Sequence, residues 1–147
     1  MTGILTIFLK ATSLKFFFHP DPKYPIYLEY EVNHLNKELV LIIPNIKGNF
    51  KGWIPWKYEN ENRVIKKVNI VGGKMEKDAK IKAWSAELFF PYGLFSPLPN
   101  VPPVSGTTWN ANFYRLDYDT GKMIKWAWTP INKSFHEFEK YGSILFE

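Results

Sequence analysis

Hydrophobic and polar residues alternate strictly over several short stretches of the chain. The alternation is most regular in residues 26–33, IYLEYEVN, where every second position is apolar. Because neighbouring side chains of a strand point to opposite faces of a sheet, this pattern predicts an antiparallel strand with one buried face and one polar, exposed face. Glu29 and Glu31 lie on the predicted polar face.

The same alternation predicts a succession of short strands separated by turn residues. The predicted strands comprise residues 4–9, 12–19, 26–33, 38–43, 64–71, 80–90, 107–116, 122–129 and 144–146. In the long strand 80–90, the alternate positions from Lys82 to Phe90 form the more apolar set, which is predicted to face the core. Pro44 is expected to end the strand 38–43, because proline cannot donate a hydrogen bond to the ladder.

A helical pattern is nearly absent. The exception is residues 134–141, where the capping sequence Ser134-x-x-Glu137 favours one or two helical turns before Gly142. The whole pattern predicts an all-β fold, an antiparallel β-sandwich (jelly-roll-like) with one short C-terminal helical turn. Because 147 residues fit one domain, a single domain is expected over residues 1–147.

Residues 106–130 are predicted to form one hairpin that carries many aromatic and polar side chains. The turn 117–121, DYDTG, contains the Asp and Gly residues that tight reversals favour. Alternation places Trp126 and Trp128 on one face of the second strand. In the first strand, one face carries Trp109, Ala111, Phe113 and Arg115, and the other carries Asn110, Asn112 and Tyr114. The hairpin therefore offers a ligand both flat aromatic surfaces and hydrogen-bonding groups.

These side chains suit a saccharide. An indole ring can cover the apolar C–H face of a sugar, while amide and guanidinium groups can bond its hydroxyls. The candidate carbohydrate-binding residues are Trp128, Trp126, Trp53, Trp56, Asn112, Arg115 and Tyr114, of which Trp53 and Trp56 belong to a polar, loop-like segment, residues 45–63. The alternative interpretation places the tryptophans in the core or beneath the loop, and the amides in structural cross-strand bonds.

Composition narrows the range of partners. Aromatic residues make up 18% of the chain, and Trp and Tyr in excess of core needs are typical of ligand platforms and interfaces. The net charge of +5 is scattered without a long Lys/Arg cluster, so no nucleic-acid partner is predicted. No apolar run approaches the roughly 20 residues of a membrane span, so no membrane partner is predicted. The absence of cysteine excludes disulfides and thiol catalysis.

No catalytic residue and no metal ligand are predicted. Glu29 and Glu31 lie about 7 Å apart on one strand face and could act as the paired carboxylates of a glycoside hydrolase, which stays open as an alternative function. Asp117-x-Asp119-x-Gly121 resembles half of a calcium loop but lacks the distal Glu. No cofactor is therefore predicted, and a structural calcium ion has no clear motif. A further alternative makes the aromatic surface a protein-interaction interface.

An ordered set of motifs resembles the family 9 carbohydrate-binding modules, and more closely the family-9-like domains of bacterial glycan-processing proteins. The order and spacing of the set carry the resemblance, since each motif alone is short. Together covering about residues 14–147, the motifs are FFF (16–18) before a Pro/Asp turn, YLEYEVN (27–33), WSAEL (84–88) running into FPY (90–92), GTTWNANFYR (106–115), WTP (128–130), FH (135–136) and FEKYG (138–142).

The resemblance implies a non-catalytic, sugar-binding β-sandwich of the kind often attached to xylanases or other glycoside hydrolases. It implies a role in polysaccharide breakdown, with a mono- or oligosaccharide as the ligand. In the family, tryptophans sandwich a sugar at a chain end. Trp128, which precedes Thr-Pro, matches the late-strand position best, and Trp53 or Trp56 is the expected partner of Trp128.

Family domains usually begin some tens of residues earlier, so this domain is expected to be N-terminally shortened. The loss of strands would leave an unpaired sheet edge through which the protein could associate. Family members are usually secreted or held at the cell surface. The first ten residues, MTGILTIFLK, lack the basic start and the cleavage site of a signal peptide, so the location is not predicted.

Overall fold

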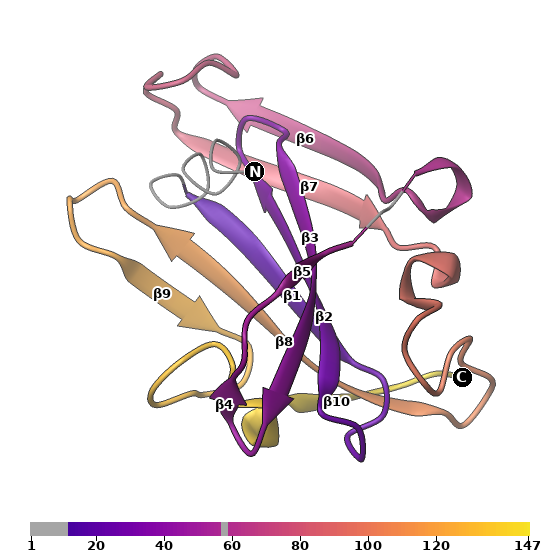
Figure 1. The fold of residues 1–147 in the computed structure, drawn as a ribbon. Coiled ribbons are helices and arrows are strands. Elements are labelled where there is room, and N and C mark those ends of the chain that lie inside the picture. The colour runs from indigo at the N-terminus through magenta and orange to yellow at the C-terminus, as the bar shows by residue number, and fades with distance from the viewer. Residues whose placement is uncertain (1–11, 57–58) are drawn as a thin grey trace.

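The computed structural model describes residues 12–56 and 59–147 (Figure 1). Regular structure in these ranges consists of antiparallel strands and short 3₁₀ turns, so the predicted all-β fold is confirmed. The strands are β1 (Ser13–His19), β2 (Ile26–Asn33), β3 (Glu38–Ile46), β4 (Asn49–Phe50), β5 (Ile54–Pro55), β6 (Ile65–Val71), β7 (Ala83–Phe89), β8 (Thr108–Asp117), β9 (Ile124–Ala127) and β10 (Gly142–Leu145). The 3₁₀ turns are η1 (Asn60–Asn62), η2 (Tyr92–Phe95) and η3 (Phe138–Lys140). The strand expected at residues 4–9 lies outside the described residues.

The strands form one large sheet and one small sheet. The large sheet has the order β10–β8–β1–β2–β3–β4, with β5 also paired to β3 and β9 to β8, while β6 and β7 form a separate hairpin. One edge of β8 pairs with β1, so β9 and β10 share the other edge. There β9 pairs with residues 114–117 and β10 with residues 108–111, which places the two short strands end to end along β8.

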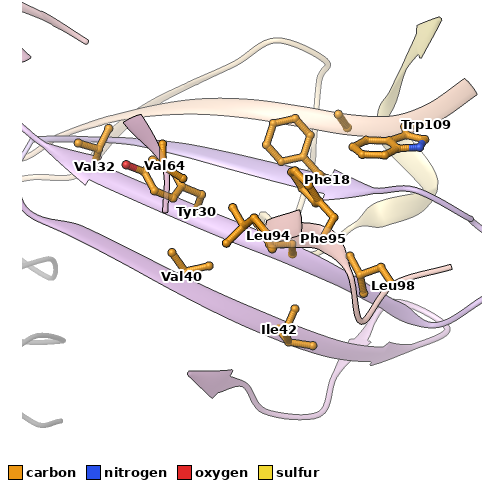
Figure 2. Packing of buried hydrophobic residues seen from close by; sticks show 12 residues of the cluster. Phe18, Tyr30, Val32, Val40, Ile42, Val64, Leu94, Phe95, Leu98 and Trp109 are labelled. Carbon is orange, nitrogen blue, oxygen red and sulfur yellow. The ribbon is translucent and has the colours of Figure 1, made fainter. Parts of the chain in front are cut away.

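One face of the large sheet packs against the small sheet and the loop that follows it. Figure 2 shows the rings of Phe18, Phe95 and Trp109 gathered in this core, where the Phe95 centroid lies 5.3 Å from that of Phe18 and 5.1 Å from that of Trp109. Ala86, Leu88 and Phe90 pack against the same cluster. The inward orientation predicted for the alternate positions of the strand 80–90 is therefore confirmed for these three residues, whereas Lys82 is exposed.

The other face of the large sheet is covered by residues 129–141, which we call the strap. Apolar strap residues pack on a second buried cluster that includes Phe17, Tyr27 and Tyr114. The strap residues in this core are Ile131, Phe135, Phe138 and Tyr141. The large sheet is thus covered on both faces.

The predicted C-terminal helical turn is present as η3. The carboxylate of Glu137, just before this turn, accepts hydrogen bonds from the backbone N–H groups of Asn132, Lys133 and Ser134 at 2.6–3.1 Å. These backbone donors, with the ammonium of Lys140, lower the pKa of Glu137 to about 2. The acidic residue of the predicted capping sequence therefore organises the strap.

The prediction that β2 has an exposed polar face is wrong. Glu29 and Glu31 are each only 4% exposed, and the ammonium of Lys15 on β1 contacts both carboxyl groups. The alternation correctly separates the two faces, but it carries no information about the strap. Phe135 of the strap lies over Lys15, with its ring centroid 5.5 Å from Nζ.

The prediction that Pro44 ends its strand is also wrong, since β3 continues to Ile46. Proline lacks a donor, but the neighbouring backbone groups keep the pairing intact. The N–H of Asn45 donates to the carbonyl of Pro25 at 2.8 Å, and the N–H of Lys51 donates to the carbonyl of Pro44 at 3.1 Å. The segment 45–63, predicted to be a loop, accordingly contains β4, β5 and η1.

Candidate functional site

An open hollow of about 400 Å³ lies beside the hairpin formed by β8 and β9. Three short stretches line it: residues 14–16 of β1, residues 113–115 of β8, and residues 126–128 at the end of β9. The lining is mostly apolar, because Leu14, Phe16 and Phe113 belong to the partly buried rim of the first core. Such an open, aromatic depression is suited to a ligand that lies flat on the surface.

Trp126 and Trp128 are the exposed aromatic residues of the hollow, with 48% and 51% of their surface accessible. The backbone N–H of Trp128 donates to the carbonyl of Phe113 at 2.9 Å, which extends the pairing with β8 beyond the end of β9. The Trp128 indole stacks on the Phe113 ring with centroids 5.2 Å apart and 28° between the planes. Trp128 is therefore fixed by the protein while half of it remains open to solvent.

Gly142 provides the space that the Trp128 indole occupies. A Cβ atom at position 142 would lie 2.7 Å from Cζ3 and 2.9 Å from Cη2 of Trp128, and 2.8 Å from Cγ2 of Thr129. Such separations are far inside van der Waals contact. The start of β10 therefore carries no side chain where the indole edge lies.

Asn112 holds the backbone directly after Trp128. Its side-chain amide donates to the Thr129 carbonyl at 3.0 Å, and its side-chain carbonyl accepts from the Thr129 N–H at 2.9 Å. The Thr129 hydroxyl in turn donates to the Lys140 carbonyl at 2.9 Å. Since β9 has ended and β10 has not begun at this point, Asn112 replaces the missing ladder bonds and fixes the chain that carries the indole.

Arg115 is the polar group that lies beside the exposed indoles. Its guanidinium carbon is 4.8 Å from the centroid of the Trp126 ring, within cation–π range. Nη2 lies 3.5 Å from Oδ2 of Asp117, and just over half of the Arg115 side chain is exposed. Arg115 therefore brings hydrogen-bond donors and a positive charge to an otherwise apolar hollow.

The structure separates the predicted carbohydrate-binding residues. Trp126, Trp128 and Arg115 meet at the hollow, whereas the side chains of Asn112 and Tyr114 are buried on the other face of β8. The amide of Asn112 donates to the Tyr114 hydroxyl at 3.0 Å, and this hydroxyl donates to the carbonyl of Phe135 in the strap at 3.1 Å. Both residues hold the strap in place.

Trp53 and Trp56 do not line the hollow. Trp56 packs against the first core, and its indole N–H donates to the Leu94 carbonyl at 2.9 Å. Trp53 packs against the second core, on the other face of the large sheet. The two tryptophans are therefore partly buried against the two cores rather than placed beside Trp128.

Sequence reasoning missed Leu14, Phe16 and Gly142 as parts of this surface. Alternation within β1 puts Leu14 and Phe16 on one face, but it cannot show that β1 pairs with β8. The register places Leu14 opposite Arg115 and Phe16 opposite Phe113. In the sequence, Gly142 was recognisable only as a residue that ends a helical turn. Its role in leaving space for the Trp128 ring depends on the folded structure.

The ionisable groups of a second set of residues lie under the strap, on the face of the sheet opposite the hollow. Burial lowers the pKa of Lys15, but its attraction to Glu29 and Glu31 outweighs this and raises the pKa overall. Burial raises the pKa of Glu29 to about 8, against the opposing effect of Lys15. Burial also lowers the pKa of His136 to about 4; Nδ1 of this neutral ring lies 2.6 Å from the Tyr27 hydroxyl. These groups have partners within the protein and serve to pack the strap.

Within residues 12–56 and 59–147, no cluster of three or more His, Cys, Asp or Glu residues is placed to hold a metal ion. Over the same ranges, no helix has the length and apolar character required to cross a membrane.

Comparisons with known proteins show a similarity of fold. Neither protein families nor curated proteins give a match to this chain. Among solved structures, the chain is similar to a crystal structure described as a "putative carbohydrate-binding protein" from Bacteroides uniformis ATCC 8492, with a TM-score of 0.73 and 20% sequence identity. The similarity covers 92% of this chain and 61% of that chain, so this chain spans less than two thirds of its length. The chain therefore has the fold of a protein to which carbohydrate binding has been ascribed.

Proposed function

We propose that this chain binds a mono- or oligosaccharide at the hollow beside β8 and β9, without chemically altering it. The observation that carries the proposal is the pair of half-exposed indoles, Trp126 and Trp128, with a guanidinium beside them. A sugar ring that covers an indole removes apolar surface of both from water, while its hydroxyls remain available to Arg115 and to solvent. Exposed, immobilised aromatic rings favour such stacking because little conformational entropy is lost on binding.

The fold and the sequence support the same function. The Bacteroides uniformis structure shares the fold, and its description names carbohydrate binding. The ordered motifs of the chain resemble family 9 carbohydrate-binding modules. We extend the proposal accordingly to a family-9-like module that acts in polysaccharide breakdown, next to a glycoside hydrolase that performs the chemistry.

The buried position of Glu29 and Glu31 favours binding over catalysis by the chain itself. A glycoside hydrolase needs two carboxyl groups that flank the scissile bond of a bound sugar. Here both carboxyl groups contact Lys15 on the strap side of the sheet, whereas the hollow lies beside Trp126 and Trp128. A hydrolytic function of Glu29 and Glu31 is therefore the weaker alternative.

Calorimetric titration with xylo-, cello- and galacto-oligosaccharides tests the proposal. We expect at least one series to bind, and Trp128→Ala to remove most of the affinity, because truncating an aromatic anchor commonly costs 2 kcal/mol or more, which is over tenfold. Phe89→Ala is the matched control, since Phe89 is 63% exposed on the small sheet and lies outside the hollow. It should leave binding unchanged.

Two results would contradict the proposal. One is a folded protein that binds no member of any series. The other is a protein whose affinity survives Trp128→Ala and Trp126→Ala. A concentration-dependent dimer that shields both indoles from solvent would instead support the protein-interaction alternative.

A further inference from the structure

The electrostatic character of the hollow indicates the chemical class of its ligand. Two residues among the described residues that line it carry a positive charge, Lys15 and Arg115. The ammonium of Lys15 is engaged by Glu29 and Glu31 on the opposite face of the sheet. Arg115 is therefore the lining cation whose charge faces the exposed indoles.

The hydrogen-bond donors of Arg115 are largely unused. A guanidinium has five N–H donors, and its one ion pair in the described structure is a contact of 3.5 Å with Asp117. Its side chain is 53% exposed. Asp117 also accepts the backbone N–H of Asp119 at 2.9 Å within the hairpin turn, so this carboxylate is shared. The guanidinium thus retains donors that can take a further acceptor.

The two indoles have different surroundings. Arg115 lies over the Trp126 ring, whereas Trp128 stacks on Phe113. Alternate residues of a strand are about 7 Å apart on one face. A sugar ring on Trp128 would therefore lie beside the guanidinium on Trp126, and a charged substituent of that ring could reach the guanidinium edge directly.

We propose that the ligand is an acidic saccharide, in which a uronic acid ring stacks on Trp128 and its carboxylate binds Arg115. This inference rests on the proposed function and specifies the class of ligand. The planar fork of an arginine matches a carboxylate in a two-point hydrogen bond, and charge assistance makes such bonds about twice as strong as neutral ones. Trp126, whose ring lies under the guanidinium, serves as a positioning residue.

Matched pairs of sugars test the inference, because they differ only in the acid group. Galacturonic acid is compared with galactose, and oligogalacturonate with its methyl ester, by calorimetry on the full chain. We expect the free acids to bind about tenfold more tightly than their neutral counterparts, the effect of one charge-assisted interaction at a half-exposed site. Added salt should weaken the binding of the acids and leave that of the neutral sugars unchanged.

Three variants test whether Arg115 is responsible for the preference for acidic over neutral sugars. Arg115→Gln should abolish the preference for acids while the neutral sugars still bind. Asp117→Asn should strengthen acid binding, because it removes the negative charge that competes for the guanidinium. Lys125→Gln is the control of equal charge change, because Lys125 lies on the other face of β9, with Nζ 5.5 Å from the Phe135 centroid. It should leave the preference intact.

The outcomes separate this inference from the proposed function. Equal affinity for the acid and neutral members of each pair would overturn the inference and leave saccharide binding standing. Tighter binding of galactose 6-sulfate than of galacturonic acid would overturn the assignment to a carboxylate. Failure of every sugar to bind would overturn both.

Discussion

Substitution of Gly142 by Ala tests whether the fold holds the Trp128 indole in place. Ala at a strand position usually stabilises relative to Gly by about 0.4–1 kcal/mol, since it restricts the unfolded chain. Here the new Cβ would lie 2.7 Å from Cζ3 of Trp128 and 2.8 Å from Cγ2 of Thr129, so at least one of these groups must move. We therefore expect the opposite sign, a loss of stability.

The size of the loss follows from what must be displaced. If the indole moves, it loses its stack on Phe113, and an aromatic pair of this kind contributes about 0.5–1.5 kcal/mol. The contact with Thr129 adds an overpacking cost, and overpacked sites typically lose about 1–3 kcal/mol in total. We expect Gly142→Ala to lower the free energy of unfolding by about 1–2 kcal/mol and to weaken saccharide binding.

A double-mutant cycle, followed by chemical denaturation, measures how strongly the effect of Gly142→Ala on the free energy of unfolding depends on Trp128. Gly142→Ala should cost clearly less in a Trp128→Ala background, because the largest obstruction is then absent. Equal cost in both backgrounds would show that the indole does not occupy the space above Gly142. A stabilised single variant would refute the geometry altogether.

Three further predictions concern the support around the hollow and the strap. Asn112→Ala should lower the free energy of unfolding by about 2–4 kcal/mol in urea denaturation, because the backbone N–H and carbonyl of Thr129 both lose their partner. A loss below about 0.5 kcal/mol, which is typical of a surface substitution, would contradict a role of Asn112 in fixing Thr129. Burial raises the pKa of Glu29 to about 8 in the folded protein, whereas the unfolded carboxyl loses its proton near its ordinary pKa of 4.5. The free energy of unfolding of the wild type should therefore fall, relative to that of Glu29→Gln, as the pH rises between these two values. A difference that stays constant over this range would show that Glu29 titrates normally. Trp56→Phe should lower the free energy of unfolding by about 1 kcal/mol, because the hydrogen bond to the Leu94 carbonyl is lost. Saccharide affinity measured by calorimetry should stay unchanged, and weaker binding would show that Trp56 contributes to the binding site.

The sequence predicted the strands well because alternation reflects which side of a sheet a residue occupies. The bounds of β2 agree with the alternation in residues 26–33, and the inward positions of the strand 80–90 pack in the first core. The buried state of Glu29 could not be predicted in this way. It depends on Lys15 of the neighbouring strand β1, which lies 14 residues earlier in the chain, and on strap residue Phe135, which lies more than a hundred residues later.

The candidate site was predictable only in part, for a related reason. Alternation grouped Trp126 with Trp128, and the structure leaves both half-exposed beside Arg115. Alternation could not show that β8 pairs with β9 at residues 114–117 and with β10 at residues 108–111. Between these two ranges, the side-chain amide of Asn112 bonds the backbone of Thr129 in place of a strand partner. Asn112 therefore had the appearance of a ligand-binding residue, although its hydrogen bonds are made within the protein.

The most direct test of saccharide binding at the hollow is an NMR titration that follows the indole N–H resonances of the six tryptophans. The resonances are assigned by single Trp→Phe substitutions, and galacturonic acid, oligogalacturonate and the neutral oligosaccharides are added in turn. We expect the resonances of Trp126 and Trp128 to shift with saccharide concentration, while those of Trp56 and Trp109, whose indole N–H groups are hydrogen-bonded within the protein, stay in place. Shifts confined to the core tryptophans, or no shift with any saccharide, would contradict this expectation.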